Sequence, residues 1–314
     1  MSEGALRPED VAIRIIDKHA DVIEAALRER FPSLHVSRIA LQSDARLKAL
    51  ISFRPPEDEN LDQYDWIHST GAGVDAICSG LPETGALPVI TRTTGRMGEQ
   101  IAEYCVGYAL EHLQQMRHRR EAHASLVWDR DSTAPRFLFD SEVAVVGTGE
   151  IGRVIGATFE RLGARVTGYS RSGRQREGLQ RVQALQAEGS LVGADIVVLA
   201  LPATQETENL VSVDLLGRLE GALLINIGRG TTLDHDALRQ ALDQGSVSHA
   251  VLDVFEEEPL PQADWQWTDE RVTVTPHVAG LTLADDAVNR FCDLLAEVLR
   301  TGQLPDSVDV TRGY

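Results

Sequence analysis

The sequence predicts an α/β protein with two domains, each built on a parallel sheet, the second domain being inserted into the first. Short apolar runs alternate with helical patterns along the 314 residues, which is typical of parallel α/β folds. The apolar runs of the second half are continuous, as in central strands that are covered on both faces. The last helical pattern, Ala284–Arg300, is expected to return to the first domain, which would therefore be split.

The first hundred residues contain the elements of one α/β unit. Val11–Ile16, Ala49–Phe53, Asp65–His68 and Pro88–Thr91 are short apolar runs and predict strands. Asp21–Arg30 is amphipathic and predicts a helix between the first two of them.

A long helical pattern follows, beginning near Gly98 and running towards His118. Its apolar face is broad, as expected of a helix buried between two domains. The next elements are a strand at Glu142–Val146, a helix at Ile151–Leu162 and a strand at Ala164–Tyr169. Three further apolar runs predict central strands: Asp195–Leu201, Ala222–Ile227 and Ser248–Val254.

The composition excludes several classes of protein. A net charge of −18 argues against nucleic acid as a partner, and the one basic cluster, Arg117–Arg120, is predicted to be a solvated helix face. Three widely separated cysteines indicate neither a disulfide framework nor a zinc site. Since we find neither a secretory signal nor a membrane-spanning stretch, we expect a cytoplasmic protein. Arginine surrounds the histidines near residue 118 and no HExxH motif is present, so we expect no metal.

The segment from Val143 to Gly152 has the pattern of a dinucleotide-binding turn between a strand and a helix. Gly147 would make the tight turn, Gly149 would let a pyrophosphate approach, and Gly152 would let the helix pack on the strand. The amides of Glu150 and Ile151 would then begin a helix that points its positive end at the phosphates. We expect a Rossmann-like dinucleotide domain at residues 97–280, inserted into a Rossmann-like substrate domain at 1–96 and 281–314.

The segment after the next strand predicts the choice of coenzyme. A site for NAD would carry Asp or Glu there to bind the ribose 2′-hydroxyl. This chain has Ser170, Arg171, Ser172 and Arg174 instead, which suit a 2′-phosphate. We therefore expect NADP(H) to be preferred, with NAD(H) as the alternative.

Three polar residues follow predicted strands at the sheet edge where open α/β folds bind ligands. Arg229 comes after the strand that ends at Ile227, Glu258 after the strand that ends at Val254, and His277 within Thr-Pro-His. Glu256 and Glu257 are alternative carboxylates, although the following Pro-Leu-Pro favours Glu258.

Several motifs in this order resemble the D-isomer-specific 2-hydroxyacid dehydrogenases over roughly residues 69–280. Besides the segments above, the resemblance includes Thr70–Asp75, Glu99–Tyr104 and Leu201–Thr207. The short spacing from Glu258 to His277 and the Ser-Arg-Ser segment are similar to the glyoxylate/hydroxypyruvate reductase branch. The chain departs from the family at Phe139–Glu142, which lacks a frequent glycine, and at Thr94, where aspartate is common.

The resemblance implies a role for each matching residue in a reaction between a small 2-keto or 2-hydroxy acid and the dinucleotide. His277 matches the acid/base, Glu258 its carboxylate partner, and Arg229 the residue that holds the substrate carboxylate and polarises the carbonyl. The backbone of Ala72, Gly73 and Val74 matches the loop that grips the carboxylate. The matches also imply cofactor contacts: Leu201, Pro202, Ile227, Gly228, Arg229, Asp253 near the nicotinamide, His277 and Gly280.

The family also implies a homodimer, for which the broad apolar face of Gly98–His118 is the expected interface. Two alternatives remain open at this point. One is another dehydrogenase of the superfamily, such as a 3-phosphoglycerate dehydrogenase. The other is a dinucleotide-sensing binding protein like the C-terminal-binding-protein corepressors. The physiological 2-keto acid and the direction of flux stay undetermined.

Overall fold

The computed structural model describes residues 5–41, 44–56, 58–82 and 86–309. The chain forms two compact units. The outer unit contains the residues up to Met97 and those from Leu281 onwards, and the inner unit is Gly98–Gly280. Each unit contains one parallel sheet, so the expected fold class, two α/β units with parallel sheets, is confirmed.

The outer unit has a five-stranded sheet in the order β2-β1-β3-β4-β5. Its strands are β1 (Val11–Ile15), β2 (His35–Ser37), β3 (Leu47–Ile51), β4 (Trp66–Ser69) and β5 (Val89–Arg92). Its helices are α1 (Ala20–Arg30), α2 (Asp75–Cys78) and α8 (Ala284–Thr301).

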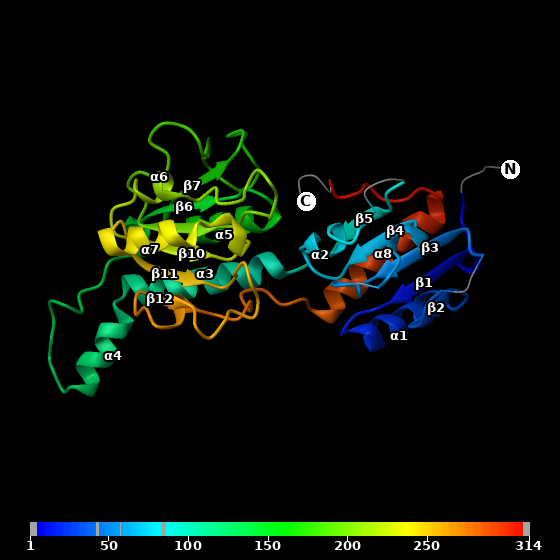
Figure 1. The fold of residues 1–314 in the computed structure, drawn as a ribbon, viewed down its shortest axis with the longest axis horizontal. Helices are drawn as coiled ribbons and strands as arrows, with labels where there is room; N and C mark the ends of the chain where they lie inside the picture. The colour runs from blue at the N-terminus through cyan, green and yellow to red at the C-terminus, as the bar shows by residue number, and fades with distance from the viewer. Residues whose placement is uncertain (1–4, 42–43, 57, 83–85, 310–314) are drawn as a thin grey trace. The chain divides into compact units, whose positions relative to one another are not determined.

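Helix α8 joins the two ends of the chain in one core. In Figure 1 this C-terminal helix, orange to red, lies within the unit of the N-terminal strands. Its buried side chains include Phe291, whose ring stacks on Trp66 of β4 at 4.7 Å between centroids. Next to them, burial lowers the pKa of His68 to about 3, and its ring nitrogens lie 2.7 and 3.0 Å from the hydroxyls of Thr91 and Thr93. The imidazole of His68 is therefore neutral, and each of its ring nitrogens has a hydrogen-bond partner, as a buried polar group requires.

The inner unit has a seven-stranded sheet in the order β12-β11-β10-β9-β6-β7-β8. Its strands are β6 (Glu142–Val146), β7 (Arg165–Ser170), β8 (Val182–Ala184), β9 (Ile196–Leu199), β10 (Ala222–Asn226), β11 (Val247–Leu252) and β12 (Val272–Val274). Its helices are α3 (Met97–Leu113, whose first residue belongs to the outer unit), α4 (Met116–Ala124), α5 (Glu150–Arg161), α6 (Val213–Leu216) and α7 (His235–Gln244). Short 3-10 helices lie at Pro8–Asp10, Leu61–Gln63, Leu138–Asp140, Gly230–Thr232 and Trp265–Trp267.

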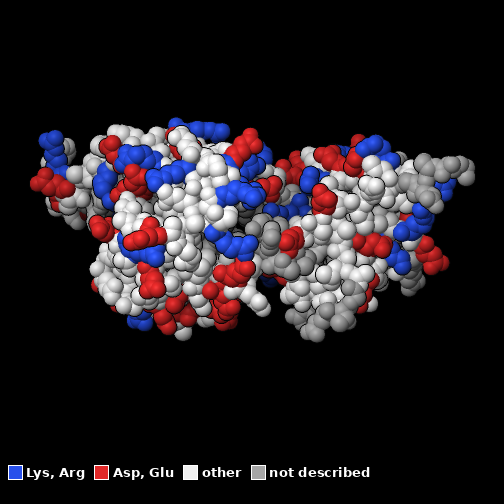
Figure 2. All heavy atoms as spheres, turned by 90° about the horizontal axis from the view of Figure 1, so that it is seen from above, with Lys and Arg blue, Asp and Glu red and all other residues white. Residues whose placement is uncertain are grey.

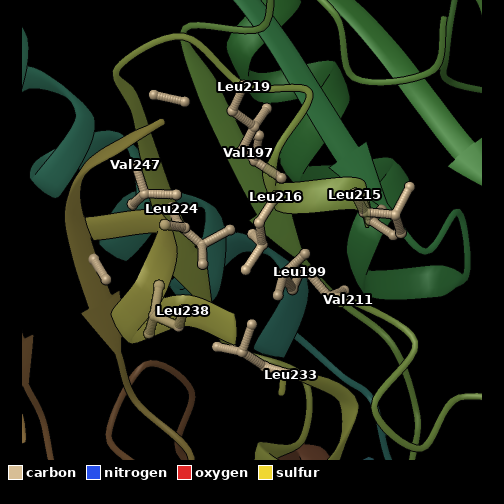
Figure 3. Close-up of a cluster of buried hydrophobic side chains, with 14 of the residues drawn as sticks. Val197, Leu199, Val211, Leu215, Leu216, Leu219, Leu224, Leu233, Leu238 and Val247 are labelled. Atoms are coloured by element: carbon tan, nitrogen blue, oxygen red, sulfur yellow. The ribbon is translucent and has the colours of Figure 1, made fainter. Parts of the chain in front are cut away.

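The order of this second sheet positions a ligand site. The chain starts at the central strand β6, continues outward through β7 and β8, and then returns to β9 on the other side of β6. Open α/β sheets bind ligands at such a reversal, outside the carboxyl ends of the strands. Beneath this edge, leucine and valine side chains of β9, β10, α6 and α7 form one buried cluster (Figure 3). Because this cluster is closely packed, the strand ends are held in place, and so are the starts of the loops that follow them.

The predicted strands are all present, and their ends agree with the structure to within two residues. The sequence analysis missed β2, β8 and β12, which are three residues long and lie at sheet edges. The side chains of β8 and β12 are only partly buried, and β2 buries only Val36, so none of the three leaves an apolar run to detect.

The prediction of one helix from Gly98 to His118 was wrong. Helix α3 ends at Leu113, and Gln115 has the left-handed value φ 52°, which an α-helix cannot continue through. Helix α4 then begins at Met116 and buries none of its side chains. The solvated character predicted for Arg117–Arg120 is confirmed: Arg117 pairs with Glu121 at 2.9 Å and with Glu270 at 3.0 Å.

Acidic and basic side chains are interspersed over both units on the face drawn in Figure 2. Among the described residues, no helix is long and apolar enough to cross a membrane. The same part of the chain contains no group of three or more His, Cys, Asp or Glu side chains that could hold a metal ion.

Candidate active site

The glycine loop, residues 147–152, joins β6 to α5 and is closely packed at two of its three glycines. Gly147 has φ 104°, and a Cβ there would lie 2.4 Å from the carbonyl oxygen of Ala200. A Cβ on Gly152 would lie 1.8 Å from the carbonyl oxygen of Gly147. Both positions therefore require glycine.

The third glycine of this loop faces open space. A Cβ on Gly149 would have no heavy atom of the described chain within 4 Å. Gly149 is also the N-cap of α5, whose first turn contains Glu150 and Ile151, and as a glycine it has no side chain of its own to cap this helix end. The N-terminus of α5 therefore has open space in front of it at Gly149, which fits the pyrophosphate of a dinucleotide.

The Arg171 loop, residues 170–174, follows β7 and has a fixed turn. The Ser170 hydroxyl accepts a hydrogen bond of 3.1 Å from the Gly173 amide, and the Ser172 hydroxyl accepts one of 3.3 Å from the Arg174 amide. The Arg171 side chain is exposed and forms an ion pair with Glu206. The sequence analysis missed Glu206, because its only signal was membership of the Leu201–Thr207 motif.

The Glu206 loop, residues 201–208, follows β9 and includes the predicted cofactor contacts Leu201 and Pro202. The hydroxyl of Thr207 donates to the carbonyl of Pro202 at 2.6 Å and accepts from the amide of Thr204 at 2.9 Å. Gly228, after β10, lies against this loop, since a Cβ there would be 2.7 Å from the amide nitrogen of Leu201. Ile227 and Gly228 therefore border the same edge as the Glu206 loop.

Arg229 lies between two closely packed glycines at the end of β10. Its Nη1 donates to the carbonyl of Gly228 at 2.7 Å, and its own carbonyl accepts from Thr232 Oγ1 at 2.7 Å. A Cβ on Gly230 would lie 2.0 Å from the carbonyl carbon of Phe255. The Arg229 segment is thus packed against the start of the loop that carries Glu258.

The structure brings His277 and Glu258 together. His277 Nδ1 lies 2.8 Å from Glu258 Oε2, and Glu258 Oε1 accepts from the Phe255 amide at 3.0 Å. The two side chains are 44% and 33% exposed, so solvent or a ligand can reach them. Because a carboxylate can only accept, Nδ1 carries the proton of this bond and Nε2 is the nitrogen available to a substrate.

Asp253 holds the loop that carries His277. Its carboxylate is buried and accepts three hydrogen bonds, from the Thr275 hydroxyl at 2.6 Å and from the amides of Val278 and Ala279 at 2.9 Å each. Its carbonyl accepts from the amide of His277, which has φ 53°. The sequence analysis placed Asp253 near the nicotinamide; within the protein, its oxygens hold the His277 loop from Thr275 to Ala279.

Tyr104 of α3 extends this network. Its hydroxyl lies 2.6 Å from Thr275 Oγ1. Because Thr275 donates to Asp253, the Tyr104 hydroxyl is the donor to Thr275. Burial raises the pKa of Tyr104 well above its ordinary value, which keeps the phenol protonated as this bond requires. The sequence analysis quoted Tyr104 within a motif but gave it no role, since its contact is distant along the chain.

In the outer unit, the loop of Ala72, Gly73 and Val74 follows β4. The Ser69 hydroxyl donates to the carbonyl of Gly73 at 2.8 Å, and Arg92 donates to the carbonyl of Ala72 at 3.1 Å. Both bonds hold the backbone of the loop through its carbonyl groups. The amides of Gly73 and Val74 take part in neither of these two bonds. Such a loop can present amide donors to an anion.

The inner unit therefore combines an open glycine turn, a helix N-terminus and a histidine–carboxylate pair on one sheet edge. These features are typical of dinucleotide-dependent oxidoreductases, in which a histidine paired with a carboxylate is suited to acid/base chemistry. The model of the D-isomer specific 2-hydroxyacid dehydrogenase NAD binding domain matches residues 94–279. The chain belongs to this family, as the motifs predicted, and is an NAD(P)-dependent oxidoreductase acting on the CH–OH group of 2-hydroxy acids.

Several relatives cover nearly the whole chain. A glyoxylate/hydroxypyruvate reductase A of Serratia proteamaculans is 33% identical over 301 residues, covering 92% of this chain and 95% of the relative. A D-isomer specific 2-hydroxyacid dehydrogenase of Xanthobacter autotrophicus, solved with NADPH and MES, has a TM-score of 0.83 at 30% identity, covering 96% and 99%. An NADPH-dependent glyoxylate/hydroxypyruvate reductase of Sinorhizobium meliloti, solved with NADP and sulfate, has a TM-score of 0.82 at 26% identity, covering 97% and 100%.

Proposed function

We propose that the protein reduces glyoxylate or hydroxypyruvate with NADPH. The observation that carries the proposal is the bond of 2.8 Å between His277 and Glu258 on the same sheet edge as the open glycine loop. The similarity to glyoxylate/hydroxypyruvate reductases supports the small 2-keto acid, and the relatives solved with NADPH or NADP support the coenzyme.

The residues divide the work of ketone reduction as follows. The dinucleotide, when bound, supplies the hydride. His277 donates a proton from Nε2 to the ketone oxygen, and Glu258 stabilises the imidazolium and fixes the ring. Arg229 holds the substrate carboxylate with its guanidinium fork and polarises the carbonyl. The amides of Gly73 and Val74 remain our proposed second contact to the carboxylate.

The Arg171 loop supports NADPH over NADH because β7 ends in Ser170, without a carboxylate for the two ribose hydroxyls. Charge-assisted hydrogen bonds from Arg171 or Arg174 to a 2′-phosphate contribute about 1.5–3 kcal/mol each, and about 1.4 kcal/mol is tenfold in affinity. Since the side chains of Arg171 and Arg174 are exposed, solvent and salt screen these bonds, and the lower end of this energy range applies. We expect a roughly tenfold preference for NADPH in kcat/KM.

A steady-state panel tests this function. Glyoxylate, hydroxypyruvate, pyruvate and bulkier 2-keto acids are assayed with NADPH and with NADH. We expect glyoxylate or hydroxypyruvate with NADPH to give the highest kcat/KM, and Arg171→Ala to raise the KM for NADPH much more than that for NADH. An equal or better kcat/KM with NADH would contradict the coenzyme choice, and no turnover with any 2-keto acid would favour a dinucleotide-sensing binding protein.

We also propose a homodimer, whose interface includes the apolar segment after α4. Leu126, Val127 and Trp128 are 92%, 56% and 96% exposed, and in Figure 1 α4 and the following loop project from the inner unit. Exposed apolar side chains in sequence mark an interaction site, and a two-fold dimer buries the same patch on both copies. The predicted face of α3 is less suited, because half of its apolar residues are buried within the chain and the others are partly buried.

Light scattering at micromolar concentration tests the dimer. We expect a dimer for the wild type and a shift towards monomer for Trp128→Ser. Val192→Ser is the control, since Val192 is also exposed (61%) but lies in another part of the inner unit. A monomeric wild-type protein would overturn this part of the proposal.

The free thiols of the three cysteines agree with a reducing compartment, which supports our placing the enzyme in the cytoplasm.

A further inference from the structure

The ion pair between Arg171 and Glu206 joins two loops across the reversal of the inner sheet. Arg171 follows β7 and Glu206 follows β9, while β6 with the glycine loop lies between these strands in the sheet. The pair therefore spans the edge on which the adenosine end of a dinucleotide lies in this type of fold. Arg171 is also the guanidinium that we propose as a 2′-phosphate ligand.

Both loops are held in place independently of the pair. On the Arg171 side, Gly173 has φ 64°, and a Cβ there would lie 2.6 Å from the amide nitrogen of Ala184. On the Glu206 side, the Thr207 hydroxyl bonds two backbone groups of its own loop. The two charges are thus presented by ordered turns, and a ligand meets the pair at a defined place.

The pair is open to exchange. The side chains of Arg171 and Glu206 are 65% and 67% exposed, and exposed pairs are weak. A 2′-phosphate approaching Arg171 replaces Glu206 as the partner and leaves a carboxylate close to a like charge. A coenzyme with a 2′-hydroxyl brings no such competitor, so the ion pair can stay closed.

Building on the proposed use of NADPH, we propose that Glu206 is a specificity-determining residue that competes with the 2′-phosphate for Arg171. Glu206 then limits the preference for NADPH over NADH to a modest value. NAD sites of this fold have a carboxylate at the end of β7, where this chain has Ser170. In our proposal Glu206, from the loop after β9, partly takes the place of that carboxylate in disfavouring a 2′-phosphate.

Substitution of Glu206 measures this competition. We expect Glu206→Gln to lower the Kd of NADPH about three- to tenfold, since it removes an exposed pair and a like charge, and to leave the Kd of NADH within about twofold. Binding is followed by the fluorescence of the reduced dinucleotides. Adenosine 2′,5′-bisphosphate, titrated calorimetrically against adenosine 5′-monophosphate, gives the same comparison without the nicotinamide.

Two further variants isolate the pair. Glu208→Gln removes a carboxylate from the same loop and is expected to leave both Kd values within about twofold. In the Arg171→Ala background, Glu206→Gln is expected to lose most of its effect on NADPH, because a double-mutant cycle reports the coupling of the two residues.

Three results would overturn the inference: an unchanged NADPH-to-NADH ratio in Glu206→Gln, an equal gain in Glu208→Gln, or a full gain in the Arg171→Ala background. The proposed coenzyme choice fails on a different result, namely a wild-type protein that binds NADH as well as NADPH and is indifferent to Arg171→Ala.

Discussion

His277→Ala is expected to lower kcat for the reduction of a 2-keto acid by about 10²–10⁴-fold, the usual contribution of a positioned general acid. The Kd of NADPH should stay within about twofold, because the glycine loop and the Arg171 loop do not depend on this side chain. Single-turnover kinetics and a fluorescence titration separate the two quantities. A kcat within about fivefold of wild type would show that another group protonates the ketone oxygen.

The pH profile distinguishes acid/base chemistry from a structural role of the same pair. If His277 is the proton donor, reductive kcat/KM is expected to fall as pH rises, because its imidazolium loses the proton that it must donate. Glu258 stabilises that cation across 2.8 Å, so Glu258→Gln should move the fall to lower pH. Glu257→Gln is the matched control, since this neighbouring carboxylate makes no bond to His277 among the described contacts. A profile that is unchanged in Glu258→Gln would assign the partner role to another group or to none.

The features of the fold that sequence analysis predicted are those with a strong local signal. Central strands such as Glu142–Val146 are buried on both faces and read as continuous apolar runs. The edge strand β12 is only partly buried and has no such run, although it leads directly into the His277 loop. The break after α3 also lacked a signal, because Gln115 is neither glycine nor asparagine and yet has a left-handed backbone.

The site divides in the same way. Gly147 and Gly152 could be assigned from spacing, because the close approach of backbone groups excludes any side chain there. The contacts of Glu206 and Tyr104 could not, since each depends on a partner 35 or 171 residues away that only the folded sheet brings near. For the same reason, the sequence left three candidate carboxylates beside Pro259, and the fold selects Glu258 as the one bonded to His277.

The backbone around Arg229 is held by groups that a side-chain substitution does not remove. Thr232 Oγ1 and Asn226 Nδ2 both donate to the carbonyl of Arg229, at 2.7 and 3.3 Å. The close packing of Gly228 and Gly230 fixes the chain on either side. Replacing the side chain of Arg229 removes its bond to the Gly228 carbonyl but leaves these other supports of the loop, so it should test the chemistry of the guanidinium more than the fold of the loop.

Arg229→Gln is expected to lower kcat/KM for the 2-keto acid by about 10²–10⁴-fold. A guanidinium fork makes two charge-assisted bonds to a carboxylate, each contributing about 1.5–3 kcal/mol, and about 1.4 kcal/mol is tenfold. Arg229→Lys keeps the charge but loses the fork, so it should recover only part of the loss. Thermal unfolding and the Kd of NADPH serve as controls for folding and for the cofactor site. If Arg229→Gln keeps kcat/KM within about tenfold while its unfolding is unchanged, the substrate carboxylate is held by other groups, with the amides of Gly73 and Val74 as the next candidates.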